Sequence, residues 1–338
     1  MHGMGKGNWL KRLLRLQLAS SVVLLITVQE IKAQQATPLP AFVPQPGPVV
    51  MEEPRRRSLF HVAGESLFGD ARAQPSTWRP LPLRTFFTEG WNEAWVDSPK
   101  SSGGVPRFGW INAFDGVMFR VWFLAFAYVN NFNDNGNEYL GSYSIYTPLN
   151  RRFEFRFDLP FIVSNKGGES NSYHGNWGDT VISSRFLLAE SQDLSQILAL
   201  DIRTPTGSLS NGNGISSLTA EYEFWYNFTG RWALRGGTGV TVPTNHVGGR
   251  TLYFTNLSIG RYLTDQSDKP FSGLFGYLSS NFNTTLDNRS PNRTFLGLTP
   301  GIRCYLGHSW VFLAGVEVPV TGPKLYDYKP IFLLLKVY

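Results

Sequence analysis

The chain has 338 residues, a formal net charge of +6, 34 glycines and 14% aromatic residues, and its mean hydropathy is −0.16. This length suits one large β domain or two ordinary domains, and the low hydropathy excludes a bundle of apolar membrane helices. The single cysteine, Cys304, excludes an intramolecular disulfide and a zinc site built from several thiolates.

The first 33 residues have the composition of an export signal. Basic residues between Lys6 and Arg15 precede an apolar run at residues 18–28, and a cleavage site ends at Ala33. The run is shorter than the roughly 20 residues of a membrane-spanning helix, although an uncleaved anchor is the alternative. Without residues 1–33 the chain keeps 26 basic and 24 acidic side chains, a net charge of +2. The basic character of the whole chain therefore gives little support to nucleic-acid binding.

Residues 34–116 lie between this signal and the regular part of the sequence. Residues 34–57 are rich in proline, which predicts an extended linker. Residues 58–116 show no sustained period of two or 3.6. They nevertheless contain four tryptophans: Trp78, Trp91, Trp95 and Trp110. Disordered tails are poor in aromatic residues, so we expect an ordered but irregular segment here.

An alternating pattern begins at Val117 and is clearest at residues 151–163, where apolar side chains at every second position alternate with charged ones. A period of two sends successive side chains to opposite faces of a strand. One face of this strand is therefore aromatic and apolar, and the other is charged. Similar segments predict twelve strands: 118–130, 138–149, 151–163, 180–189, 196–204, 217–227, 231–242, 250–263, 271–283, 294–306, 309–320 and 326–338.

The lengths of these strands and of their connections predict a membrane barrel. About ten residues suffice for a tilted strand to cross a bilayer. The predicted connections alternate between long and short, as do the external loops and periplasmic turns of such barrels. A soluble Greek-key sandwich, the alternative, has no reason to follow this rule. We therefore expect an all-β fold over residues 117–338, an antiparallel transmembrane β-barrel of about 12 strands. Residues 58–116 would pack beneath it or thread into its lumen as a plug.

The last predicted strand ends on Tyr338 and carries Phe332 and Leu334 on one face. This pattern resembles the C-terminal signature of bacterial outer-membrane proteins that the barrel-assembly machinery recognises. Lys336 departs from the signature on the same face, where its ammonium group would extend toward lipid headgroups.

Three short motifs of the predicted barrel occur in a familiar order: Gly178-Asp179 before a strand, RTPTG at residues 203–207 after one, and GVEVPVTG at residues 315–322. Together they resemble the outer-membrane family named for the meta-pathway of phenol degradation, itself similar to FadL-type channels for hydrophobic compounds. The resemblance covers residues 117–338 and implies a β-barrel for passive uptake of hydrophobic or aromatic molecules. No motif before Val117 matches a FadL-type plug, so the resemblance implies nothing about a gating element.

Charged side chains of the predicted strands lie opposite the apolar face, which predicts that they line the lumen. A charge facing lipid would cost about 2–4 kcal/mol at the midplane, which supports this orientation. The mixture of both signs favours a structural lattice of ion pairs or a weakly selective water path. The candidate lumen-lining residues are Arg152, Glu154, Arg156, Asp158, Arg185, Asp201, Arg203, Glu221, Glu223, Arg235, Arg303 and Glu317.

No catalytic, metal or cofactor site is predicted. None of the five histidines shares a strand face with a second ligand at metal-site spacing. His308 and Ser309 are adjacent, and adjacent side chains of a strand point in opposite directions, so they are a poor hydrolytic pair.

The sequence thus predicts a passive channel for small hydrophobic or aromatic compounds in the bacterial outer membrane, and no enzyme. Its expected partners are outer-membrane lipid, the barrel-assembly machinery and a small hydrophobic solute, without nucleic acid. One alternative is a structural or surface barrel that transports nothing. A second alternative is a lipid-modifying enzyme of the outer membrane that uses His308 and Ser309.

Overall fold

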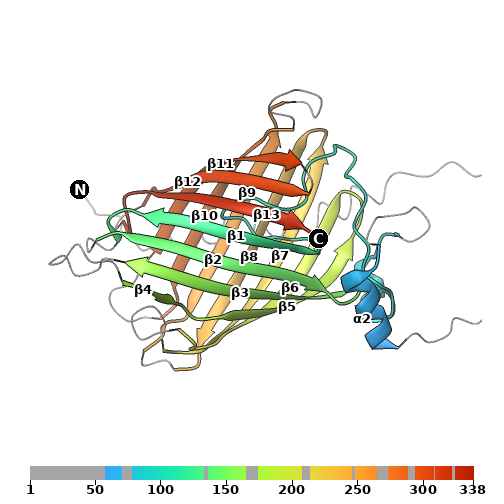
Figure 1. The fold of residues 1–338 in the computed structure, drawn as a ribbon, viewed down its shortest axis with the longest axis horizontal. Coiled ribbons are helices and arrows are strands. Elements are labelled where there is room, and N and C mark those ends of the chain that lie inside the picture. Colours follow the sequence, from blue (N-terminus) through green and yellow to red (C-terminus); the bar gives the residue numbers. More distant parts are fainter. Residues whose placement is uncertain are drawn as a thin grey trace, which may run out of the picture. The chain divides into compact units, whose positions relative to one another are not determined.

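A computed structural model describes residues 58–70, 78–132, 136–164, 174–207, 214–245, 248–264, 273–287, 294–307, 309–321 and 324–338. Its main element is a 13-stranded antiparallel sheet (Figure 1). The strands are β1 (Val121–Val129), β2 (Glu138–Pro148), β3 (Phe153–Ser164), β4 (His174–Trp177), β5 (Val181–Glu190), β6 (Leu194–Arg203), β7 (Ser217–Thr229), β8 (Trp232–Pro243), β9 (Leu252–Tyr262), β10 (Phe275–Thr285), β11 (Thr294–Gly307), β12 (Trp310–Pro319) and β13 (Lys329–Val337).

The sheet closes on itself. β1 pairs with both β2 and β13, and β2 also pairs with β3. β3 also pairs with β5. The short β4 pairs with the last four residues of β3, at the end opposite the turn that joins β2 to β3. The result is a closed barrel of 12 strands with one extra strand, which confirms the predicted antiparallel barrel. Closure leaves no free edge on the barrel strands, so their backbone groups bond within the sheet.

The strand ends lie within a few residues of the predicted ones, with two differences. β4 falls in a segment that the sequence predicts as a loop, because its four residues, HGNW, are too few to alternate. β10 begins only at Phe275, so its connection from β9 spans residues 263–274 instead of the predicted 264–270. This connection is as long as several loops at the opposite end. The alternation of long and short connections is therefore not strict.

The barrel has two distinct ends. At one, which we call the terminal end, β1 begins, β13 finishes and the shortest turns lie (right in Figure 1). The opposite end, the loop end, carries most of the longer connections. The helix α2 (Leu59–Phe68) lies at the terminal end (Figure 1), where Ser66 Oγ donates a hydrogen bond to the carbonyl oxygen of Leu149 at the end of β2 (3.0 Å). A short 3₁₀ turn, η1 (Leu83–Thr85), follows. None of the helices in the described ranges has the length and apolar character needed to cross a membrane.

The outward face of the barrel is apolar. Along β6, the exposed Leu198, Leu200 and Ile202 alternate with the buried Ala199 and Asp201. This is the orientation that the alternating pattern predicts, and it places the charged side chains inside.

Lys336 also lies on the outward face of the barrel, close to the terminal end. Its Nζ is 5.1 Å from the centre of the Trp310 ring, and that ring packs edge-on against Trp122 at 5.2 Å. Aromatic residues and an extended ammonium group are typical of the interface between lipid and water. Lys336 is the basic residue that departs from the aromatic pattern of the last strand, and here it contacts an aromatic ring.

Candidate functional site

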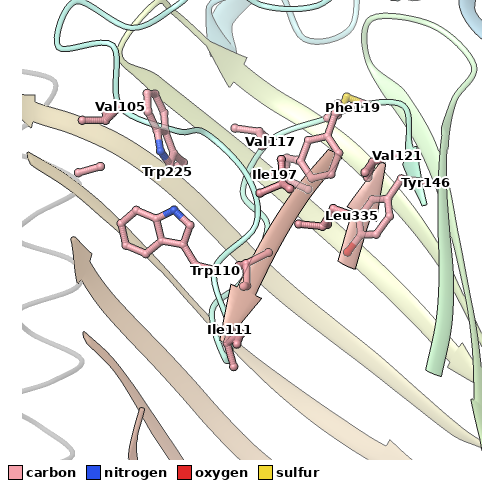
Figure 2. Close-up of a cluster of buried hydrophobic side chains, with 14 of the residues drawn as sticks. Val105, Trp110, Ile111, Val117, Phe119, Val121, Tyr146, Ile197, Trp225 and Leu335 are labelled. Carbon is pink, nitrogen blue, oxygen red and sulfur yellow. The ribbon is translucent and has the colours of Figure 1, made fainter. Parts of the chain in front are cut away.

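Residues 104–119, which we call the plug, run through the interior of the barrel (Figure 2). Side chains from three strands donate hydrogen bonds to carbonyl oxygens of the plug. They join Tyr262 to Gly104 (3.1 Å), Trp225 to Pro106 (3.2 Å) and Ser279 to Ile111 (2.9 Å). The plug is therefore attached to the wall through its backbone.

The plug is a loop that enters from the terminal end and returns to it. Its tip, residues 112–115, reaches the middle of the barrel. Asn112 Nδ2 donates to Thr299 Oγ1, halfway along β11, over 2.8 Å. The carbonyl oxygen of Asn112 accepts a hydrogen bond from Asn256 of β9. β1 begins at Val121, directly after the plug, so the plug is joined to the wall without a linker.

One side of the plug is apolar and packs against β1, β12 and β13. Val121, Leu313, Ile331 and Leu335 of these strands point inward and are buried. Phe108, Trp110, Ile111, Val117 and Phe119 of the plug belong to the same cluster, and Figure 2 shows Phe119 and Val117 beside Leu335 and Val121. This is a conventional apolar core, placed inside a barrel whose outer face is also apolar. Burying such side chains contributes about 1.5–3 kcal/mol each.

The other side of the plug meets charged side chains of β3, β5, β7 and β8. Arg185 of β5 pairs with Glu154 of β3 and with Glu223 of β7 (2.7 Å), and its guanidinium also donates to the carbonyl oxygen of Asp115. Glu154 accepts a hydrogen bond from the backbone N–H of Phe119 (2.9 Å). Because buried charges are costly unless they are paired, this network holds both its own members and the returning arm of the plug.

The tip is held by a second charged group. Arg235 of β8 donates from Nε to the carbonyl oxygen of Phe114 (2.9 Å) and pairs with the Asp115 carboxylate. Tyr146 of β2 donates from Oη to the same carboxylate (3.0 Å). The Asp115 carboxylate thus bonds to Arg235 of β8 and to Tyr146 of β2, which lie in different parts of the barrel wall. These two contacts hold the tip of the plug in place.

Glycines make room for the plug at two close approaches. A Cβ on Gly116 would lie 2.3 Å from the backbone carbonyl carbon of Phe224 in β7. A Cβ on Gly237 of β8 would lie 2.7 Å from the ring of Phe114. Both distances are below any normal carbon–carbon contact, so these positions require glycine.

Ten of the predicted lumen residues lie on inner faces of strands. Glu154, Arg185, Arg235 and Glu223 contact the plug or one another as described. Arg156 pairs with Asp158 (2.9 Å) and with Asp201 (3.2 Å), and Glu221 is buried on the same side of the barrel. Glu317 of β12 pairs with Lys329 of β13 (2.7 Å). Most of these side chains form a lattice of ion pairs on the inner wall.

The other two predicted residues lie at the ends of the barrel. Arg152 sits in the turn before β3 at the terminal end, where it donates to the carbonyl oxygens of Glu89 and Leu187 (both 2.9 Å). It therefore holds the segment beneath the barrel, because β3 begins at Phe153, two residues later than the predicted start at residue 151. Arg203 is exposed at the loop end of β6.

Arg303 of β11 has an unusual environment. Its side chain is fully buried, yet none of its three guanidinium nitrogens has a hydrogen-bond partner among the described residues. The guanidinium carbon lies 5.4 Å from the ring centre of Phe108 in the plug and 4.4 Å from that of Tyr305. Two aromatic rings thus stand where a counter-ion would be expected.

Two cavities border the plug from opposite ends. The first, of about 350 Å³, opens at the loop end between the tip and Asn281, Phe295 and Glu317. The second, of about 500 Å³, lies at the terminal end and is lined by rings that include Phe108 and Phe119 of the plug. The plug lies between them, so in this conformation the two cavities are not one continuous pore.

The tryptophans of the N-terminal segment separate into two groups. Trp110 is inside the barrel, stacked on Tyr277 at 5.4 Å (Figure 2 shows its place on the plug). Trp95 is buried at the terminal end, where its backbone N–H donates to Ser66 Oγ (2.8 Å), and Trp91 lies 6.4 Å from Phe186. Residues 78–103 thus pack beneath the barrel and only residues 104–119 enter it, so both predicted placements occur in one segment.

The candidate metal ligands and the pair His308 and Ser309 can be compared with the described residues. The described residues contain no group of three or more histidine, cysteine or acidic side chains that could hold a metal ion. His308 lies outside the described residues, and Ser309 has a positive φ of 67° in the turn before β12.

Comparisons with known proteins support the fold. No protein-family model matches the chain, and no curated protein does. Among solved structures it is similar to the COG4313 outer membrane channel from Pseudomonas putida F1, with a TM-score of 0.50, 11% identity and coverage of 68% of this chain and 98% of that one. It is also similar to the NanC porin (TM-score 0.46, 4% identity, 64% and 99%) and the KdgM porin (0.42, 7%, 64% and 99%). At this level of identity the likeness to the Pseudomonas channel shows a shared barrel fold.

Proposed function

We propose that this chain is a channel of the bacterial outer membrane in which small solutes pass when the plug moves. The observation that carries the proposal is the pair of cavities at opposite ends of the barrel, with the plug between them. A purely structural barrel has no need of two open vestibules. The likeness in fold to a channel from Pseudomonas putida is consistent with this function.

The membrane location rests on the surface of the barrel. Large apolar side chains such as Phe126, Leu200 and Leu257 are exposed on its outer face. A soluble protein rarely exposes so continuous an apolar surface, whereas a barrel in lipid requires it. Lipid is therefore one partner of the chain. The barrel-assembly machinery is the second, through β13, and export would depend on residues 1–33, which lie outside the described residues.

The solutes are proposed to be small and hydrophobic or aromatic. Val121, Leu313 and Leu335 make the inner wall of β1, β12 and β13 apolar toward the terminal end, and the cavity there is lined largely by apolar and aromatic side chains. A path between the plug and this wall would suit such molecules better than fully hydrated ions. The resemblance of three motifs to the phenol meta-pathway family points in the same direction.

A closed structural barrel is the second candidate function. It is favoured by the number of charged contacts that fix the plug, above all those of Arg185 and Arg235. If these contacts never break, the plug keeps the two cavities separate and no solute passes through the barrel.

Measurements of conductance distinguish a channel from a closed structural barrel. The full-length protein, purified in detergent and inserted into planar bilayers, should give discrete current steps. Variants that weaken the hold on the plug should give larger or more frequent steps than the wild type. If folded wild-type protein and folded plug variants were all silent, the channel would be refuted and the structural barrel favoured.

A further inference from the structure

Within the described residues, every buried arginine except Arg303 has hydrogen-bond partners for its guanidinium group. Arg185 and Arg235 have carboxylates and plug carbonyls, and Arg120 donates to three carbonyl oxygens at the end of α2. Arg107 pairs with Glu190 (3.3 Å) and donates to nearby carbonyls. Arg303 alone among the buried arginines of the described ranges has all three guanidinium nitrogens unpartnered.

An unpaired buried guanidinium is costly. A guanidinium cannot shed its proton in a protein, so Arg303 cannot escape the cost by becoming neutral. Its contacts with the rings of Phe108 and Tyr305 supply a cation–π attraction, but they use none of its five N–H donors. A buried polar group without a partner calls for an explanation, and a bound ion that satisfies it is one such explanation.

We propose that Arg303 binds the carboxylate of a small aromatic acid in the cavity at the terminal end. This inference rests on the proposed channel function, because it requires the plug to move, and it names a solute class for that channel. The planar fork of a guanidinium matches a carboxylate through two parallel hydrogen bonds. The aromatic ring of the solute would take the place of a ring that now covers the guanidinium.

The cavity has the lining that such a solute needs. It is lined by Phe108, Phe119, Tyr262 and Tyr305, and its volume is about 500 Å³, within the range of small-molecule sites. Arg303 lies directly behind two of these rings and does not itself reach the cavity surface.

The plug controls access to Arg303. Phe108 belongs to the plug, and the next residue, Gly109, lies against the arginine, since a Cβ there would be 3.5 Å from Arg303 Nε. A shift of the plug therefore uncovers the guanidinium on the side of the cavity. Anion binding and plug displacement would then favour one another.

Other charges at the cavity are already compensated or exposed to solvent. Arg107 is paired with Glu190. Lys100 is exposed to solvent, and Asp97, which has the opposite charge, lines the same cavity. Lys100 therefore provides a matched control, since its removal deletes one positive charge from the cavity lining without touching Arg303.

The test compares benzoate with benzamide, which has nearly the same shape and no charge. Equilibrium dialysis of each labelled compound against the full-length protein in detergent micelles gives the two affinities. We expect benzoate to bind at least about tenfold more tightly, a difference of about 1.4 kcal/mol. In Arg303→Gln this preference should disappear, in Arg303→Lys it should survive in part, and in Lys100→Gln it should change less than about twofold. Heat-modifiable mobility on gels shows that each variant has folded.

The measurement is repeated in Gly116→Ala, in which the new Cβ is expected to displace the plug. A closed plug then does not block access to Arg303. Equal binding of the two compounds in both backgrounds would overturn the inference, as would equal losses in Arg303→Gln and Lys100→Gln. Binding is measured without passage, so the outcomes are separable. If benzoate binds through Arg303 but the barrel never conducts, the proposed channel function is refuted and the proposed carboxylate site at Arg303 stands.

Discussion

Arg235 of β8 donates from Nε to the carbonyl oxygen of Phe114 over 2.9 Å, so a side chain of the barrel wall holds the backbone at the tip of the plug. The same guanidinium pairs with the Asp115 carboxylate. Charge-assisted contacts of this kind fix direction as well as distance. The position of the tip is therefore set by a few charged contacts in addition to apolar packing.

Arg235→Ala should loosen the plug and raise conductance. The substitution leaves the Asp115 carboxylate without its cation and the Phe114 carbonyl without its donor, and breaking one partner of a buried pair costs about 3–5 kcal/mol. That cost falls on the plug, since β8 keeps its backbone pairing with β7 and β9. Single-channel recordings in planar bilayers should show conductance several-fold above the wild type.

Arg156→Ala is the matched control for this experiment. It also removes an inner arginine, but one whose partners, Asp158 and Asp201, belong to the wall. Conductance should stay within about twofold of the wild type, because both ion-pair partners of Arg156 belong to the wall and neither holds the plug. The same increase in both variants would show that the contact with the tip has no special part in closure.

Gly116→Ala should displace the plug by steric overlap. The new Cβ would lie 2.3 Å from the backbone carbonyl carbon of Phe224, and a paired strand cannot yield as easily as a loop. Amide hydrogen exchange of residues 109–116, measured by mass spectrometry in detergent, should become at least about tenfold faster as local opening becomes easier.

Gly141→Ala on β2 is the control for the glycine variant. Its Cβ would meet its nearest atoms at 3.8 and 3.9 Å, an ordinary contact. Exchange of the plug amides should be unchanged there. If both alanine variants exchange at the wild-type rate, the close approach at Gly116 does not hold the plug.

Leu198→Arg should hinder insertion of the barrel into lipid. Leu198 lies on the outer face in the middle of β6, where an arginine costs about 2–4 kcal/mol. At Leu218, the second residue of β7 near the loop end, the same substitution should cost about 0–1 kcal/mol. Urea titrations of folding into vesicles measure both values. Equal effects at the two depths would argue against a membrane-embedded outer face.

The strands and their two faces could be predicted because a single rule generates them. Alternation alone places Leu198 and Leu200 outside and Asp201 inside, and twelve such segments leave few alternatives to a barrel. The same rule sends Arg185 and Arg235 inward. Arg152 lies within a predicted strand, but β3 begins only at Phe153, and the Arg152 side chain bonds to the segment beneath the barrel.

The plug could not be predicted in the same way. Residues 104–119 have no period, and many of their hydrogen bonds to the wall are accepted by backbone carbonyl oxygens, which every sequence provides. Sequence pattern therefore identified Arg235 as an inward charge without identifying Asp115 as its partner. The isolation of Arg303 was beyond prediction as well, because the absence of a partner is a property of packing.

Arg120→Ala should release α2 from the barrel. Arg120 Nη1 donates to the carbonyl oxygens of Leu67 and Gly69 (both 3.0 Å) and Ser66 (3.3 Å), which are the groups that the last turn of a helix leaves unpaired. Hydrogen bonds from a charged donor contribute about 1.5–3 kcal/mol, so limited proteolysis should cleave residues 59–69 at least about tenfold faster when these bonds are lost.

Arg261→Ala, which removes an exposed arginine stacked on Trp232, is the control and should leave the cleavage rate unchanged. Since β1 follows Arg120 immediately, the barrel itself should resist cleavage in both variants. Release of the helix together with collapse of the barrel would instead mean that Arg120 holds the strands.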